Sequence, residues 1–239
     1  MKINSFKYYI KTNFFKQAFG SLLLQIVSIF LQIISGFILA RYLGASEFGL
    51  YSYAQSWVAI LAIIASGGLP TLVLREVSKL SEVGSKKEFN KFKIWVIKNS
   101  IVVNFILVLF WFFFFFYIWP NKTSLQIVFL WAIILIPLNA CLQIGQQYLR
   151  GLGKVRLAQV PVTIVRPGMM LSFLLILIFA YPESLFASNA IILQILAIIF
   201  SVSLLFILIK RTRPEFKGQG YNSNNINNTV LLKSMGFFL

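Results

Sequence analysis

The sequence predicts an all-α fold, a polytopic membrane helix bundle, from three observations. The 239 residues are 59% hydrophobic and 12% charged, whereas soluble domains are typically about 45–50% apolar and about 25% charged. The apolar residues gather in six runs, each near the roughly 20 residues that a helix needs to cross a bilayer. The basic residues gather between these runs, which is the pattern of a membrane topology.

The N-terminal segment, residues 1–18, is expected to be cytoplasmic or interfacial. Lysines and aromatic residues alternate in it. The apolar run that follows is longer than the ~7–15 residues of a signal-peptide core and has no small-residue cleavage site, so a cleaved signal peptide is not predicted. Residues 3–17 are expected to lie as an interfacial helix, with aromatic rings among the headgroups and lysines towards anionic lipid.

Six predicted spans form a transmembrane lobe over residues 19–209. Glycines and proline at Gly67, Gly68 and Pro70 predict a sharp break after the second span. The charged stretch 70–96 is expected to be partly helical at the membrane surface. The spans are Phe19–Ala40, Phe48–Leu69, Ile97–Trp119, Leu125–Leu149, Gln159–Tyr181 and Ala187–Ile209.

Basic residues set the predicted orientation of the spans. The outer loops hold only Arg41 and Lys122. Because positively charged loops stay in the cytoplasm, the N-terminus and the end of span six are expected on that side. The basic residues of the cytoplasmic side precede span one (Lys2, Lys7, Lys11, Lys16), separate spans two and three (Arg75, Lys79, Lys86, Lys87, Lys91, Lys93), separate spans four and five (Arg150, Lys154, Arg156) and follow span six (Lys210, Arg211, Arg213, Lys217).

The C-terminal residues divide into a linker and a new apolar run. Residues 210–228 are expected to form a cytoplasmic linker, since Pro214, two glycines and a series of asparagines fill residues 214–228. Residues 229–239 turn apolar again but are too few to cross the bilayer. They are expected to be the truncated start of a seventh helix.

Polar residues inside the spans are the main functional signal, because they usually face a partner or a water-filled cavity. In span one, Gln25, Ser28, Gln32 and Ser35 share one helical face. In span four, a similar face carries Asn139, Gln143, Gln146, Gln147 and Arg150. Each stripe alone fits interhelical hydrogen bonds as well as a hydrated cavity, and the two together with an intramembrane arginine favour the cavity.

That arginine is Arg166 in span five, one turn after Thr163. No Glu lies within a span and the sequence has no Asp, so no carboxylate is available to neutralise it. Arg166 is expected either to reach up to the cytoplasmic surface or to line a cavity and bind an anion, which guanidinium does well for phosphate. Pro167 predicts a kink beside it.

The sequence lacks the residues that catalysis and metal binding usually need. The chain has no His and one cysteine, and it has no close carboxylate pair, so an enzyme, a metal site and a cofactor are not predicted. Residues 151–154 lack the spacing of a phosphate-binding loop. Cys141, in an apolar run, is expected to be a small buried residue. The basic clusters follow the spans, so nucleic acid is not an expected partner.

Three stretches carry a resemblance to a known family. Residues 39–52 read LARYLGASEFGLYS, residues 67–70 and 74–77 read GGLP and LREV, and residues 147–154 read QYLRGLGK. In order and spacing they resemble the N-terminal half of the polysaccharide biosynthesis, or Wzx-type O-antigen flippase, family. This family belongs to the superfamily of MATE exporters and the lipid II flippase. The resemblance covers essentially the whole chain.

The resemblance implies a MATE-like transporter of two six-helix lobes in the bacterial inner membrane, of which this chain supplies the first lobe. The implied cargo is an oligosaccharide on undecaprenyl pyrophosphate, flipped by alternating access for O-antigen, capsule or exopolysaccharide synthesis. The implied partners are membrane lipids, the C-terminal lobe and a polysaccharide polymerase. By motif position, Arg41, Arg75 and Arg150 are expected to meet the cargo. Arg166, Gln25, Gln32, Asn139 and Gln143 are added from their spacing and polarity.

Three other functions stay open from the sequence. A MATE-type multidrug exporter shares the fold, but an exporter of cations favours an acidic cavity. A non-transporting fragment of a flippase would lack the second lobe. A membrane glycosyltransferase or polymerase would need acidic catalytic residues outside the spans, and these are scarce.

Overall fold

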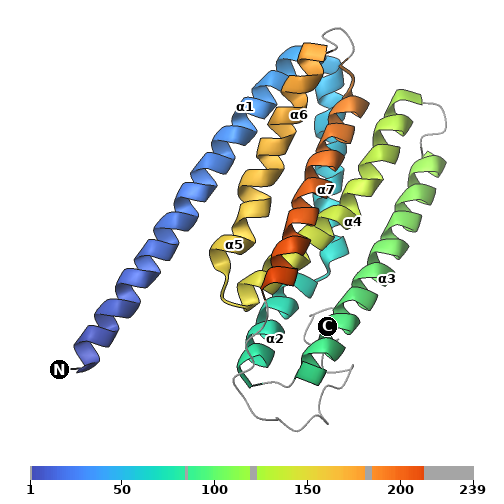
Figure 1. The fold of residues 1–239 in the computed structure, drawn as a ribbon. Helices are drawn as coiled ribbons and strands as arrows, with labels where there is room; N and C mark the ends of the chain where they lie inside the picture. Colours follow the sequence, from blue (N-terminus) through green and yellow to red (C-terminus); the bar gives the residue numbers. More distant parts are fainter. Residues whose placement is uncertain (1, 84–85, 119–122, 181–184, 213–239) are drawn as a thin grey trace.

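The computed structural model describes residues 2–83, 86–118, 123–180 and 185–212, and in these ranges the chain is helical with no strand. The helices run side by side in a bundle (Figure 1), so the predicted all-α membrane bundle is confirmed. Of the predicted linker 210–228, residues from 213 onwards lie outside the described ranges, as do the predicted seventh helix 229–239 and Lys122. The elements are α1 (Lys2–Ser66), α2 (Leu69–Val83), α3 (Lys86–Ile118), α4 (Thr123–Gly151), α5 (Val155–Val160), a π-helical turn η1 (Pro161–Val165), α6 (Arg166–Ala180) and α7 (Ala187–Arg211).

Helix α1 contains both of the first two predicted spans. Its backbone leaves the helical conformation at Gly44, where φ is 71° and ψ is 173°. The chain reverses direction there, so α1 consists of a first arm (2–43) and a second arm (45–66) (Figure 1). Five helices of the described chain are long and apolar enough to cross a membrane. The first of them, Phe19–Ser66, contains the reversal at Gly44, so each of its two arms corresponds to one predicted span.

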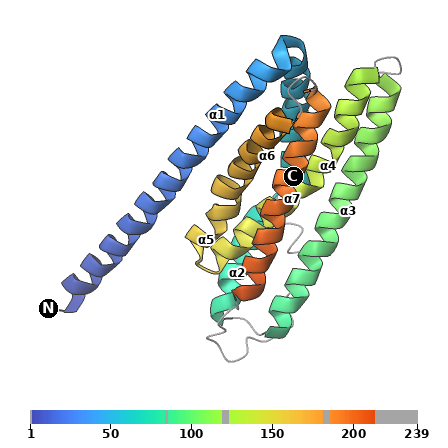
Figure 2. The same ribbon diagram turned by 45° about the horizontal axis from the view of Figure 1, so that its top comes forward.

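The first arm stands apart from the rest of the bundle at its N-terminal end (Figure 2). It begins at Lys2, so the predicted helix over 3–17 continues directly into span one; its position along the membrane surface stays a prediction. Further along, Leu39 and Leu43 are buried against α6 and α7. Phe19, Phe30 and Phe37 remain largely exposed, as suits a lipid-facing or lobe-facing surface.

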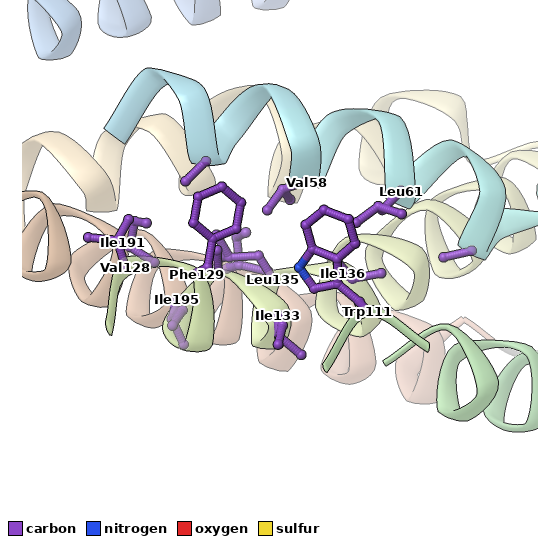
Figure 3. Packing of buried hydrophobic residues seen from close by; sticks show 14 of the residues in the cluster. Val58, Leu61, Trp111, Val128, Phe129, Ile133, Leu135, Ile136, Ile191 and Ile195 are labelled. Carbon is purple, nitrogen blue, oxygen red and sulfur yellow. The ribbon is translucent and has the colours of Figure 1, made fainter. Parts of the chain in front are cut away.

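Helix α4 lies at the centre of the bundle and packs against α7, α1 and α2. Its Phe129, Leu135 and Ile136 are almost completely buried, in a cluster with Trp111 of α3 and Val58 of α1 (Figure 3). Gly145 brings α4 and α7 close together, because a side chain there would overlap Leu205.

The stretch between spans two and three is almost entirely helical. Helix α1 ends at Ser66, and Gly67 and Gly68 adopt positive φ angles of 50° and 72°, which confirms the predicted break. Helix α2 then buries an apolar face on α4 and α3, with Arg75 and Lys79 on its exposed face. The N-terminal turns of α3 complete the stretch.

Candidate functional site

A hydrogen-bonded cluster joins the second arm of α1 to α7 inside the bundle. The Tyr51 hydroxyl donates to Gln194 Oε1 at 3.1 Å. Gln55 and Gln194 form a reciprocal amide pair, in which Gln55 Nε2 donates to Gln194 Oε1 and Gln194 Nε2 donates to Gln55 Oε1. The side chain of Gln194 is buried. The three side chains therefore satisfy one another's hydrogen bonds and join α1 to α7.

This cluster was not predicted from the sequence, because its members do not form a stripe of polar residues within one span. Gln55 and Gln194 are each the single glutamine of their span, and Tyr51 lies near a predicted span end among the aromatic belt residues. The available signal was the single glutamine in an apolar run, which needs a partner on another helix.

Arg166 lies where span five loses its α-helical regularity. The π-helical turn Pro161–Val165 separates α5 from α6, and Arg166 is the first residue of α6. Pro161 and Pro167 are buried and Arg166 is half-buried. The predicted irregularity beside Pro167 is thus present as a π turn, a feature often found at functional sites. The π turn that precedes Arg166 packs against α7 and α1, the helices that carry Gln194 and Gln55.

Three unpaired polar atoms lie in the hairpin formed by α4 and α5. Gly153, with φ of 74°, closes the turn between these helices. Within the described chain, Gln147 Oε1, Arg150 Nε and Gln159 Oε1 are buried without a hydrogen-bond partner. An unsatisfied buried polar group costs about 1–3 kcal/mol, and more when it is charged. The hairpin is therefore prepared for a ligand or water that supplies the missing bonds.

The other residues of the predicted span-four stripe lie along the same helix. Asn139 is buried, and its Nδ2 donates to the Leu135 carbonyl oxygen of its own helix at 2.8 Å. Gln143 and Gln146 are half-buried. The stripe thus turns inwards, and its unpaired members lie towards Arg150.

The predicted span-one stripe is divided between the interior and the outer surface. Ser28 and Ser35 are buried, whereas Gln25 and Gln32 are exposed. Gln32 Nε2 donates to Ser28 Oγ at 2.9 Å. The two glutamines therefore lie at the edge of the first arm, away from the hydrogen-bonded cluster.

Arg41 and Arg75 lie at opposite ends of the bundle. Arg41 is exposed beside the reversal at Gly44. Arg75 is also exposed, and its Nη2 pairs with Glu76 Oε1 at 3.4 Å. Arg75 shares its end of the molecule with Arg150, since α2 packs on α4 there. The structure does not gather the four predicted arginines at one point.

The motif 39–52 has a clear structural role. Gly44 makes the reversal, and Glu47 Oε2 accepts the backbone N–H of Ala187 at 2.8 Å. This carboxylate occupies the N-terminus of α7, where the helix dipole favours a negative charge. The motif therefore fixes the first two crossings to the start of the sixth.

Metal binding finds no support in this arrangement. Over the residues that the structure describes, no group of three His, Cys, Asp or Glu side chains is placed to hold a metal ion. The buried or half-buried polar side chains of the described residues include guanidinium, amide and hydroxyl groups, which can bind anions and sugars, and the carboxylate of Glu88.

The fold and its polar interior define a multi-pass helical membrane protein with buried cationic and amide groups. The family model described as polysaccharide biosynthesis protein matches residues 14–239, and the chain belongs to this family. No curated protein and no solved structure matches the chain.

Proposed function

We propose that this protein translocates an oligosaccharide linked to undecaprenyl pyrophosphate across the bacterial cytoplasmic membrane by alternating access. The observation that carries the proposal is the set of buried, unpaired groups of Gln147, Arg150 and Gln159. They lie in a membrane protein of the polysaccharide biosynthesis family. The cargo of such a protein combines an anionic pyrophosphate, a polar glycan and an apolar tail.

The unpaired groups suit the pyrophosphate and the first sugars. Guanidinium binds phosphate oxygens in a bidentate manner, and such charge-assisted bonds are stronger than neutral ones. The unpaired Oε1 atoms of Gln147 and Gln159 can accept hydrogen bonds from sugar hydroxyls, and the Nε2 groups of the same amides are donors. The lipid tail would stay outside, against the apolar surface of the bundle.

The π turn before Arg166 supports movement of this segment during transport. Two buried prolines, Pro161 and Pro167, flank an irregular helix at mid-bundle. Broken helices of this kind form binding sites and bend points in transporters. Arg166 would meet the anionic part of the cargo as it passes the Tyr51 side of the bundle.

An exporter of cationic drugs is the second transport function open to this fold. Its cavity would need acidic groups, yet Glu47 binds the α7 N-terminus and Glu76 pairs with Arg75. The buried Glu88 lies in the first turn of α3, at the end of the bundle and not in a predicted span. The partners that we propose are the lipid-linked glycan, a second lobe and the polymerase that consumes the flipped product. If the chain acts without a second lobe, the fragment hypothesis applies instead.

Replacement of Arg150 tests the proposal. In cells whose own flippase is deleted, the complete reading frame containing this chain should restore surface glycan. Arg150→Ala should lower the amount about 10- to 100-fold, as expected from the loss of about 1.5–3 kcal/mol of charged hydrogen bonding. Arg166→Ala should have an effect in the same direction.

Lys154→Ala is the matched control, because Lys154 is exposed in the same hairpin. It should leave the glycan unchanged. Normal glycan from Arg150→Ala at wild-type protein level would remove the proposed role of the hairpin.

A further inference from the structure

A long groove of about 1270 Å³ lies between α3, α4 and α7. This volume exceeds the roughly 300–1,000 Å³ of ordinary small-molecule pockets. Its floor on α4 includes Cys141, which is two residues from Gln143 and so lies on the opposite face of the helix from the polar stripe. The expectation that Cys141 is buried is wrong, since the thiol is exposed and lines this groove.

The groove exists because α3 and α7 both pack on α4 but barely touch each other. On α3, lining residues recur every three or four positions from Lys86 to Val108. Such a face is about 33 Å long at 1.5 Å per residue. The rims carry exposed apolar side chains, with Ile101 63%, Phe105 62% and Phe206 58% exposed. The groove is therefore open sideways, towards lipid.

Positive charge gathers at one end of the groove. Lys86, Lys93 and Lys210 line that end, and none of the described lining residues is acidic. Lys210 Nζ lies 5.8 Å from the centroid of the Phe206 ring.

The apolar part of the groove has the length of a lipid chain. From Lys93 to Val108 the α3 wall extends about 22 Å, whereas one leaflet of a ~30 Å hydrocarbon core is about 15 Å deep. A single acyl chain can therefore lie along the wall while its headgroup stays at the lysines.

We propose that this groove binds an anionic phospholipid, with one acyl chain between α3 and α7 and the phosphate held by Lys86, Lys93 and Lys210. This site is separate from the route proposed for the glycan cargo. The choice of an anionic lipid follows from the charge at the groove end together with its apolar walls. A zwitterionic lipid has no net negative charge, so it would leave the positive charge of the three lysines uncompensated.

Photolabelling in nanodiscs tests the proposal. One nanodisc contains phosphatidylglycerol with a diazirine in its acyl chain, and the other contains phosphatidylcholine with the same chain. We expect the phosphatidylglycerol probe to label peptides of α3, α4 and α7 that line the groove. The double variant Lys86→Gln/Lys93→Gln should lower this labelling by about fivefold per lysine, given the attraction of each charge to anionic lipid.

The matched control is Lys87→Gln/Lys91→Gln, which removes two exposed lysines outside the groove from the same end of α3. It should retain the labelling. The single cysteine gives a second readout without mutation: phosphatidylglycerol should slow the alkylation of Cys141 by N-ethylmaleimide more than phosphatidylcholine does.

Three results would overturn the proposal. The first is equal labelling by both lipids, and the second is an equal loss of labelling in the two double variants. The third is cross-linking of the groove to residues 213–239, which would identify the occupant as this chain's own C-terminal segment.

Discussion

Buried polar side chains in this protein fall into two groups, according to whether they find partners. Tyr51, Gln55 and Gln194 satisfy one another across two helices. Gln147 and Arg150 are left with buried, unpaired atoms in the described structure. A satisfied amide cluster stabilises the packing of helices, whereas an unsatisfied one costs free energy unless a ligand binds. The first group therefore has a structural role, and a cargo role for the second is our proposal.

Replacement of Gln194 by Leu should reduce the stability of the bundle. The substitution removes the hydrogen bonds to Tyr51 and Gln55 while keeping an apolar side chain. Interhelical hydrogen bonds in membranes contribute about 0.6 kcal/mol on average and up to about 1.7, so the loss should be about 1–2 kcal/mol. Unfolding in detergent measures it.

Ser203→Ala on the same helix is the control, because the exposed Ser203 hydroxyl bonds only within α7, to the carbonyl oxygen of Ile199. In a double-mutant cycle, Gln55→Leu should add little once Gln194 is gone. Additive losses from the two glutamine variants would contradict the proposed pairing.

At the scale of helices, irregular backbone occurs between helices, as at Gly44, Gly153 and the Gly67–Gly68 break, and at one point within a predicted span. Gly44 reverses α1, Gly153 closes the α4–α5 hairpin and η1 interrupts span five before Arg166. The first two are turns that set which helices are antiparallel neighbours. The π turn lies within a predicted span, and such turns are frequently found at functional sites.

Gly44→Ala should destabilise the protein through backbone strain alone. The φ of 71° at Gly44 is unfavourable for a residue with a side chain, and no atom lies within 4 Å of the position of an added Cβ. Strain in such regions costs about 1–3 kcal/mol. Thermal unfolding in detergent should show a lower midpoint.

Gly49→Ala provides the comparison, because Gly49 is helical and an added Cβ also meets nothing within 4 Å. There alanine should be neutral or stabilising by about 0.5–1 kcal/mol. Equal effects of the two changes would show that Gly44 does not make the reversal.

At the scale of the whole molecule, the α1 reversal lies at one end of the bundle and α2 at the other (Figure 1). The α2 end carries Arg75, Arg150, Lys154 and the start of α3, and the reversal carries Arg41. The positive-inside rule therefore predicts that the α2 end faces the cytoplasm.

Labelling from the two sides of the membrane tests this orientation. In a Cys141→Ser background, an impermeant maleimide should label Ser46→Cys in intact spheroplasts and Lys154→Cys only after permeabilisation. Both positions are exposed, and they lie at opposite ends of the bundle. The reverse pattern would contradict the predicted orientation.

Much of the fold could be predicted from the sequence, because the length of apolar runs and the bilayer thickness leave few choices. The break at Gly67 and Gly68 and the irregular helix near Pro167 were predicted by residue type. Contacts between segments that lie far apart in the sequence could not be predicted in this way. The Gln55–Gln194 pair and the Glu47 contact with the start of α7 depend on which helices become neighbours. The same holds for Cys141, whose exposure follows from the gap between α3 and α7.

The translocation of lipid-linked glycan in proteoliposomes tests the central claim most directly. The complete reading frame that contains this chain would be reconstituted with an undecaprenyl-pyrophosphate oligosaccharide, and an added glycosidase would report which sugars face outwards. We predict that the inner pool becomes accessible with the wild-type protein and remains protected with Arg150→Ala, while Lys154→Ala behaves as wild type. A protected inner pool with the folded wild-type protein, or equal exposure with Arg150→Ala, would contradict the account.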